Sequence, residues 1–547
     1  MTEIDRLLVV GHCLADRRSI AAALERDDLG ALTRLPGSYA WVLARQGELV
    51  AYTDLAGQFP LYLSRLGGRT ALASHPGVLS DLHKRSVDSV TLAVAIACPS
   101  VLPLWEHRSP YQGVSRLPGG RLIHVGQSTI RYGTAGPAPD LRAALTEAVA
   151  TRCSAAPISA DFSGGLDSTS LAFLAARHTQ VKGIVYHHPD LPTTDLAHAS
   201  SLAGHGMDLT AVTGDQSTLP YAELTYPLGG EPVRGNLAWR RSLLRLAEAA
   251  PMHVTGEGGD ALFGAAPSYL AELTRPGELR KLARHCAHNA ALKHASPLGL
   301  ATRAWRVSRT SPRQALIRLA RRVLDPDAGS PTSHGAGRPS RPGIGSLTWL
   351  DAVAWWPVDG TVLGWLTRAM RAELAIRLAD PALAERVDPD LGPAHVATRA
   401  ELRQSADAQR QLRELGAVLT GTRVHAPFLD DAVVRACLAV PAHRRVGPTV
   451  GKPLLARALR DLVPERVFAR RTKGDYSAEE YHGARASAER LHRLIDDSRL
   501  AALGAVEPGP VRACLDRLLA GAPAPLGAMA QLVATECWLR GSRPGPC

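Results

Sequence analysis

Three features are scarce in this sequence of 547 residues: lysine, closely spaced cysteines and long apolar runs. The eight cysteines include no Cys-x-x-Cys pair and none with a histidine at metal-ligand spacing, which argues against a disulfide framework and a structural zinc. The best candidate for a membrane span, 90–105, is broken by Pro99 and Pro103, so we expect a buried core segment there. The N-terminus lacks a signal-peptide layout, and the sequence therefore predicts a cytoplasmic protein with no membrane partner.

The net charge is +12, and nucleic acid is the first partner that such a charge suggests. The excess is spread along the chain and is almost wholly arginine, with no basic run interleaved with aromatic residues. We therefore expect a solvated basic surface and no nucleic-acid partner. Because arginine supplies the general positive charge, each of the few lysines is more informative about function.

The length predicts two domains. In the first, 1–135, short alternating runs such as 38–43 are separated by turn residues, as in antiparallel β-structure, and a Gly/Ala/Pro-rich linker follows. From 140 to 547 the pattern alternates between predicted helices at 141–153, 168–176, 196–205 and 237–250 and predicted strands at 157–162, 181–186, 209–212 and 252–255. This alternation predicts an α/β fold with a doubly wound parallel sheet, followed by a helical C-terminal part.

Residues 325–346 are dense in proline, glycine and serine, and we expect a flexible loop there. Four tryptophans follow this loop: Trp349, Trp355, Trp356 and Trp365. Packing of the tryptophans in a helical core is the preferred interpretation. A substrate-contacting aromatic surface beside the loop is the alternative.

The strongest functional signal is the segment Phe162-Ser-Gly-Gly-Leu-Asp-Ser-Thr169, between a predicted strand and a predicted helix. Its glycines allow a tight turn and close approach to an anion, and the helix amides and the hydroxyl groups can bind phosphate. A Walker loop would need a lysine before the Ser/Thr, and none is present. The candidate nucleotide-binding residues are Ser163, Gly164, Gly165, Asp167, Ser168 and Thr169, with Asp167 also a candidate Mg2+ ligand.

A second glycine-rich segment, Thr255-Gly-Glu-Gly-Gly-Asp260, also follows a predicted buried strand. Loops at the carboxyl ends of parallel strands converge on one crevice. We therefore expect Asp260 to face Asp167 across a metal-bound pyrophosphate, with Gly256 beside the nucleotide. Alone this segment is weak evidence, but together with the first it indicates an ATP-pyrophosphatase site.

The two segments resemble those of the asparagine synthetase superfamily, whose synthetase domain carries Ser-Gly-Gly-x-Asp-Ser and Gly-Glu-Gly-x-Asp-x-x-x-Gly elements. The resemblance continues through Glu231-Pro232, Pro427-Phe-Leu-Asp430 and the segment from Lys452 to Gly474, and covers most of 140–540 in the same order. It implies a PP-loop fold, use of ATP and Mg2+, and activation of a carboxylate as its acyl-adenylate before an amide bond forms.

The resemblance also implies roles for single residues. Asp167 and Asp260 would be the Mg2+ ligands, and Lys452 would hold the departing phosphates. Lys473 matches the family's lysine that stabilises negative charge on the adenylate and its tetrahedral intermediate. Glu257 stands where members have a glutamate or tyrosine close to the reacting amine, so it is a candidate to orient or deprotonate the nucleophile; a carboxylate bonded to loop amides is the equal alternative.

The N-terminal part departs from the family. The runs 37–42, 52–62 and 73–75 resemble the later strands of a class II glutamine amidotransferase domain of the Ntn type, but Thr2 stands where that domain has its nucleophilic cysteine. The stretch before residue 37 is also short for the early strands. We therefore predict a degenerate amidotransferase-like domain over 1–135 and an asparagine synthetase-like ATP pyrophosphatase domain over 140–547 with the flexible loop 325–346.

Without ammonia from glutamine, the amine must be free ammonia or part of the substrate. The chain most resembles lasso-peptide macrolactam synthetases, in which the N-terminal amine of a precursor peptide attacks an adenylated Asp or Glu side chain. This resemblance implies a precursor peptide as substrate, with a leader-peptide recognition protein and a leader peptidase as pathway partners. An asparagine synthetase or β-lactam synthetase acting on a small molecule is the alternative. The intact phosphate loop disfavours an inactive peptide-binding scaffold, and the lack of paired cysteines disfavours a tRNA-modifying enzyme.

Overall fold

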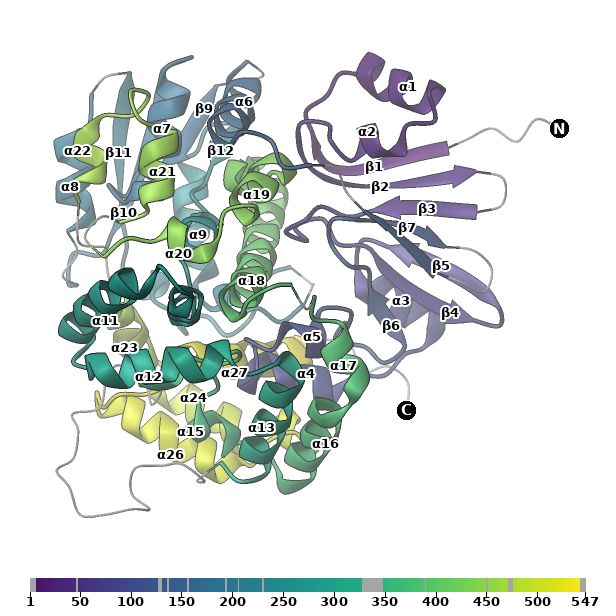
Figure 1. Cartoon of the computed structure of the whole chain (residues 1–547), viewed down its shortest axis with the longest axis vertical. Coiled ribbons are helices and arrows are strands. Elements are labelled where there is room, and N and C mark those ends of the chain that lie inside the picture. The colour runs from purple at the N-terminus through teal and green to yellow at the C-terminus, as the bar shows by residue number, and fades with distance from the viewer. Residues whose placement is uncertain are drawn as a thin grey trace.

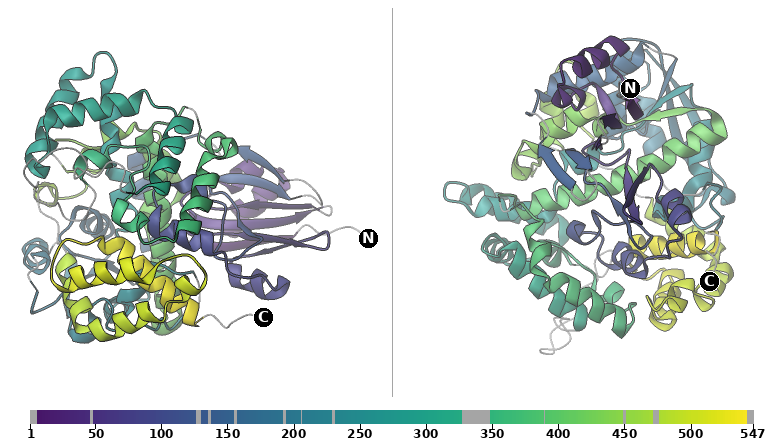
Figure 2. Two further views of the ribbon diagram at one scale, coloured as in Figure 1. Left: turned by 90° about the horizontal axis from the view of Figure 1, so that it is seen from below. Right: turned by 90° about the vertical axis from the view of Figure 1, so that its right-hand side faces the viewer.

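The computed structural model describes residues 6–45, 48–125, 130–134, 137–154, 157–191, 194–204, 206–228, 231–326, 348–388, 390–448, 451–470 and 476–541. Thr2, Lys473 and residues 327–346 of the predicted loop lie outside these described residues. An N-terminal β-rich part lies beside an α/β part and a large helical part (Figure 1). Seen from below, the N-terminal strands project from the side of the helical part (Figure 2, left).

Two antiparallel sheets form the N-terminal part. The larger has the strand order β1 (Arg6–Cys13), β2 (Gly37–Arg45), β3 (Glu48–Tyr52), β7 (Arg121–Val125) and β8 (Ile130–Thr134), and the smaller has the order β5 (Arg69–Ala73), β4 (Tyr62–Leu66) and β6 (Val114–Arg116). The β-structure expected here is present, but helices α1 (Arg17–Glu25), α2 (Leu29–Leu32) and α3 (Pro76–His83) were not predicted. The first begins at Asp16, whose carboxylate accepts from the Ser19 amide at 2.7 Å, a typical N-cap.

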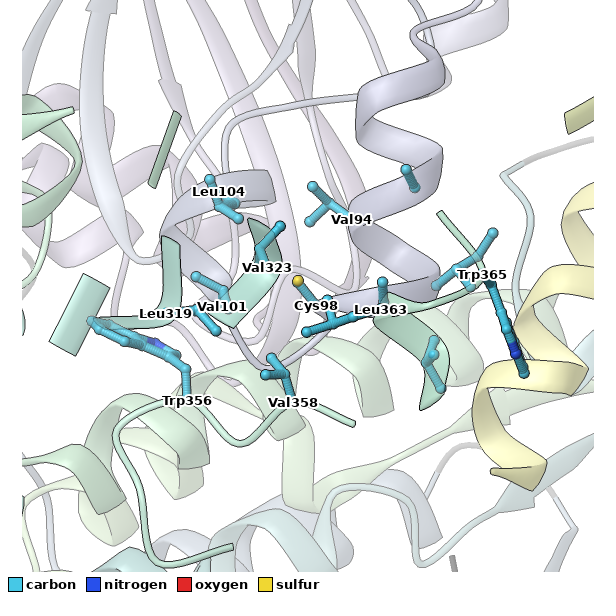
Figure 3. Close-up of a cluster of buried hydrophobic side chains, with 14 of the residues drawn as sticks. Val94, Cys98, Val101, Leu104, Leu319, Val323, Trp356, Val358, Leu363 and Trp365 are labelled. Carbon is cyan, nitrogen blue, oxygen red and sulfur yellow. The ribbon is translucent and has the colours of Figure 1, made fainter. Parts of the chain in front are cut away.

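The apolar stretch 90–105 forms two buried helices, α4 (Ser89–Ala97) and α5 (Leu102–Trp105). They belong to the same hydrophobic core as helices from the second half of the chain. Figure 3 shows Val94, Cys98, Val101 and Leu104 beside Leu319, Val323, Trp356, Val358 and Leu363. The expectation of a core segment is confirmed, and none of the described helices is long and apolar enough to cross a membrane.

The α/β part is built on a five-stranded parallel sheet. Its order is β11 (Met207–Thr213), β10 (Val181–His187), β9 (Ile158–Asp161), β12 (Met252–Val254) and β13 (Arg423–His425). Four of the strands and their helices α6 (Leu141–Cys153), α7 (Leu166–Ala176), α8 (Asp195–Leu202) and α9 (Trp239–Ala247) follow the predicted order. Strand β13 was not predicted; it comes from far along the chain and pairs in register with β12.

Helices cover both faces of this sheet. Ile158 and Val185 lie in a core with α6 and α7, whereas Ile184 and Val212 pack with Leu244 of α9. This alternation confirms the doubly wound fold. From β9 the chain adds β10 and β11 on one side, then β12 and β13 on the other, so the carboxyl ends of β9 and β12 are adjacent where the order reverses. Ligands bind at such a switch point in open α/β sheets.

Many further helices complete the molecule. They are α10 (Gly259–Phe263), α11 (Leu279–Lys293), α12 (Pro297–Ser308), α13 (Pro312–Leu324), α14 (Trp349–Ala352), α15 (Gly360–Leu363), α16 (Arg368–Ala379), α17 (Pro381–Glu385), α18 (Pro393–Leu415), α19 (Asp431–Leu438), α20 (Ala442–Arg445), α21 (Pro453–Ala458), α22 (Glu465–Phe468), α23 (Ser477–Ala486), α24 (Ala488–Asp496), α25 (Arg499–Ala502), α26 (Pro508–Leu519) and α27 (Leu526–Gly541).

Trp355, Trp356 and Trp365 are buried among these helices. Core packing, the preferred interpretation of the tryptophans, is therefore confirmed for these three. A substrate-contacting surface is wrong for them, because all three belong to one buried hydrophobic core, in which Figure 3 shows Trp356 and Trp365. The side chain of Trp349 lies outside the described residues.

Candidate active site

The first glycine-rich segment forms the turn between β9 and α7. Gly164 has φ +69°, and a Cβ there would lie 2.7 Å from Cβ of His198, so both the backbone angle and the space require glycine. Ser163 Oγ and Ser168 Oγ are 3.2 Å apart, and the Gly165 amide donates to Ser163 Oγ at 3.3 Å. The hydroxyls and the start of α7 are therefore gathered at one turn, as a phosphate site needs.

Thr169 is placed differently from the two serines. Its side chain is fully buried, and within the described part of the chain its hydroxyl has no hydrogen-bond partner. A buried hydroxyl without a partner is energetically costly. It is the one predicted member of this loop whose side chain is enclosed by protein.

The second glycine-rich segment packs directly on the first. A Cβ on Gly256 would lie 2.6 Å from the backbone nitrogen of Ser168, and one on Gly259 would lie 2.5 Å from Oδ1 of Asp167. Gly258 has φ +89°. The glycines of this segment thus let two loops from adjacent strands approach to backbone contact.

This approach brings the two predicted metal ligands together. The ammonium of Lys452 donates to Oδ2 of Asp167 and, at 2.7 Å, to Oδ1 of Asp260. Lys452 has φ +50° and directly precedes α21, so an unusual backbone angle carries its side chain between the two carboxylates. All three predicted residues therefore meet at one point beside the first loop.

The residues present fit a magnesium ion. Two carboxylates that already hold one cation between them offer the oxygen ligands that Mg2+ prefers. No group of three or more potential ligands occurs among the described residues, so protein alone would not enclose the ion. Mg2+ in nucleotide sites is commonly held by one or two carboxylates together with phosphate oxygens, which is the arrangement that Asp167 and Asp260 allow.

An anchor missed by the sequence analysis lies next to the first loop. Arg470 donates to the carbonyl oxygen of Ser163 at 2.9 Å and to Oδ1 of Asp195 at 2.6 Å. The hydroxyl of Tyr476 donates to the other oxygen of Asp195 at 2.7 Å. Burial and the Asp195 carboxylate raise the pKa of Tyr476, so its hydroxyl remains a donor. Lys473 itself lies outside the described residues, but the described residues on either side of it are tied to one carboxylate.

A cavity of about 620 Å³ opens beside the second loop. Glu257 and Asp260 of that loop are among the residues that line it. The amide of Glu257 lies 3.5 Å from Oγ1 of Thr255, and its half-buried side chain lines the cavity. The other walls come from α4 and α5, α18 and α27, and include Leu92, Ala95, Ile96, Pro99, Trp105, Glu231, Glu401, Arg403, Asp407 and Ala528.

Glu231 links this cavity to the N-terminal part. Tyr62 of β4 donates to its carboxylate at 2.6 Å, and Arg410 of α18 donates to the same oxygen at 2.5 Å. Burial and the negative charge of Glu231 raise the pKa of Tyr62, so this hydroxyl stays protonated. The N-terminal strands therefore help to fix the position of a cavity wall.

A family model described as asparagine synthase matches residues 140–540. A comparison with the curated proteins gives no match. The matched span contains both glycine-rich loops, Lys452 and Arg470, so the residues that meet in space all belong to it.

Proposed function

The chain belongs to the asparagine synthase family of ATP-dependent amide-forming ligases, and from this premise we propose that it closes a macrolactam ring in a lasso precursor peptide. The side-chain carboxylate of an Asp or Glu in the peptide is adenylated by ATP. The N-terminal amine of the same peptide then attacks this adenylate, and AMP and pyrophosphate are released.

In this proposal the two loops bind the nucleotide. The turn at Ser163 and Ser168 holds the phosphates, and Asp167 and Asp260 hold Mg2+, which neutralises phosphate charge when bound. Lys452, which lies between these carboxylates, stays close to the phosphates that leave. Lys473 keeps the role implied by the resemblance, stabilisation of the negative charge that develops on the acyl-adenylate.

The size of the cavity is the observation that carries the substrate proposal. Pockets of about 300–1,000 Å³ hold ligands of drug size, and this cavity of about 620 Å³ lies in that range. Ammonia needs no such space, and aspartate would fill a small part of it. A segment of peptide fits better, because the cavity offers both apolar walls and charged side chains along one continuous space.

A single substrate that carries both reacting groups also has a kinetic advantage. Holding the amine and the activated carboxylate in one molecule converts a bimolecular condensation into an intramolecular reaction, which removes part of the entropic barrier. As part of this proposal, a leader-peptide recognition protein and a leader peptidase would deliver the peptide. The alternative is a small substrate, as in an asparagine or β-lactam synthetase, and it leaves the size of the cavity unexplained.

The test uses the purified enzyme with ATP, Mg2+ and a candidate precursor core peptide. We expect a product lighter than the peptide by one water, formed together with AMP and pyrophosphate. No macrolactam ring should form when the N-terminus of the peptide is acetylated, or when its acceptor Asp or Glu is changed to the amide. If the acetylated peptide still loses water through that carboxylate, or if aspartate and ammonium are the better substrates, the macrolactam proposal fails.

A further inference from the structure

Glu401 is a carboxylate inside the cavity that neither glycine-rich loop provides. It lies on α18 and lines the same cavity as Glu257 and Asp260. The residue keeps exposed surface, and it is one of the charged residues that line the cavity. Within the described residues Glu401 forms no hydrogen bond or ion pair, in contrast to Glu231, which is held by Tyr62 and Arg410.

The surroundings of Glu401 favour proton uptake. Desolvation of the carboxyl by the surrounding protein raises its pKa to about 7; the Arg445 guanidinium opposes this rise, and the Asp260 carboxylate adds to it. Arg445 is itself buried and donates to the carbonyl of Leu262 and the hydroxyl of Thr398, at 3.1 and 2.9 Å. Its hydrogen bonds are directed to these groups, so Glu401 remains open to the cavity.

The wall that α4 contributes to the cavity is apolar, in contrast to the carboxylate of Glu401. Leu92, Ala95 and Ile96 present apolar side chains to the same space. A substrate with a charged amine and an apolar carbon skeleton could place its amine near Glu401 and its carbons along α4. Water would gain neither the charge attraction nor the apolar contact, and a neutral hydroxyl compound would lack the charge attraction.

We propose that Glu401 binds the nucleophilic amine of the substrate as its ammonium form and then takes up one of its protons. This inference rests on the proposed amide-forming function, but it applies to any amine-bearing substrate, peptide or small molecule. Glu257, which lies on the second glycine-rich loop and lines the same cavity, then orients the amine that Glu401 has deprotonated.

The step balances in protons and bonds. The ammonium gives one proton to the Glu401 carboxylate and becomes a neutral amine. Its nitrogen lone pair forms the C–N bond to the adenylate carbonyl, and the C–O bond to the AMP phosphate then breaks. AMP leaves with the electron pair of that bond, and the nitrogen releases a second proton to water. No oxidant, reductant or further reactant is needed.

The experiment separates the two half-reactions in the full-length enzyme. The carboxylate substrate is first identified as the one that supports ATP–pyrophosphate exchange, which reports adenylation alone. Wild type and Glu401→Gln are then compared in three assays: exchange, amide formation with the natural amine, and hydroxamate formation when hydroxylamine traps the adenylate of the N-acetylated substrate. Hydroxylamine is mostly uncharged at neutral pH, so it needs neither an anionic binding group nor a proton acceptor before it attacks.

We expect Glu401→Gln to keep exchange and hydroxamate formation within about two-fold and to lose amide formation by roughly 100-fold or more, the range for a removed proton acceptor. Glu401→Asp should recover part of the activity. Glu414→Gln makes the same change on the same helix at a residue that does not line the cavity, and it should behave as wild type in all three assays.

Two outcomes would overturn the inference. Equal losses in exchange, hydroxamate and amide formation would assign Glu401 to the structure of the site or to adenylation. Near-normal amide formation by Glu401→Gln would remove any role in the attack. Absence of exchange in wild type with every carboxylate tested would instead count against the proposed function, so the two failures are distinguishable.

Discussion

Gly259 lies so close to Asp167 that a Cβ atom on it would be 2.5 Å from Oδ1 of that carboxylate. Gly259 is the first residue of α10, and Asp167 lies in the first turn of α7. The position of a proposed metal ligand on one loop is thus set by the lack of a side chain on another. The same contact brings Asp260 within reach of the lysine that also bonds Asp167.

Gly259→Ala should therefore displace Asp167 and abolish most ATP–pyrophosphate exchange, while far-ultraviolet circular dichroism stays native. The matched control is Gly509→Ala in α26, where a Cβ would meet no atom within 4 Å. The control should keep full exchange and gain slightly in thermal stability, since alanine is the better helix former. Normal exchange in Gly259→Ala would show that the contact between the loops is dispensable.

Asp167→Asn and Asp260→Asn should each remove exchange at all Mg2+ concentrations, because each would leave one anionic ligand where we propose two. Lys452 would keep one carboxylate partner in either variant, so the melting temperature should change little. The expected loss of activity is checked by measuring ATP–pyrophosphate exchange across a Mg2+ titration. Recovery of substantial exchange at high Mg2+ in both variants would argue that neither residue is essential for the metal.

Arg470→Lys should lower turnover although the charge is kept. The guanidinium bonds both the Ser163 carbonyl and the Asp195 carboxylate, and an ammonium lacks the planar fork that serves two partners at once. We expect a loss in kcat for amide formation of about ten-fold or more. Arg457→Lys, an exposed arginine on α21, is the matched control and should remain close to wild type. Wild-type kcat in Arg470→Lys would mean that the anchor does not act on the reaction.

Lys473→Arg tests the point-charge role implied by the family resemblance. A planar, larger guanidinium should not replace an ammonium at an oxyanion, so we expect a loss of about 100-fold or more in amide formation. The measurement is the single-turnover rate at saturating ATP. A rate near that of wild type would reduce Lys473 to a general cation.

Asp161→Asn should destabilise the fold at neutral pH. Burial opposes ionisation of Asp161, but the Arg245 guanidinium at 2.9 Å and the His253 ring at 3.3 Å outweigh it and hold its pKa at about 2. A folded pKa below the unfolded value of about 3.9 contributes stability above that value, and the contribution is lost as pH falls toward about 2. Denaturant unfolding should show a loss of roughly 2 kcal/mol at pH 7, and the two proteins should converge between about pH 4 and pH 2. A constant difference across this range would contradict the electrostatic cause.

Local patterns in the sequence were sufficient to predict the strand and the helices around the first glycine-rich loop. The helix at 141–153 was predicted with the bounds that α6 has in the structure, and the strand–turn–helix context of Ser163 to Thr169 was identified, because hydrophobic periodicity and glycine placement are short-range signals. The same patterns identified 90–105 as core and led to the family that matches 140–540. The N-terminal helices were missed because α1 is marked chiefly by a single capping residue, Asp16.

Contacts between distant parts of the chain were decided only by the tertiary structure. Strand β13 completes the sheet from a position far beyond β12, and the bonds of Lys452 and Arg470 join residues between 192 and 307 positions apart. The cavity combines residues of α4, α18 and α27. The role that we propose for Glu401 follows from its place among these lining residues, which its position in the sequence does not reveal. No periodicity or motif specifies such pairings, because they depend on how separately formed elements pack to bury their apolar faces. The sequence by itself determined the family and the two loops that we propose bind a nucleotide, and packing decided which of their residues meet and which cavity lies beside them.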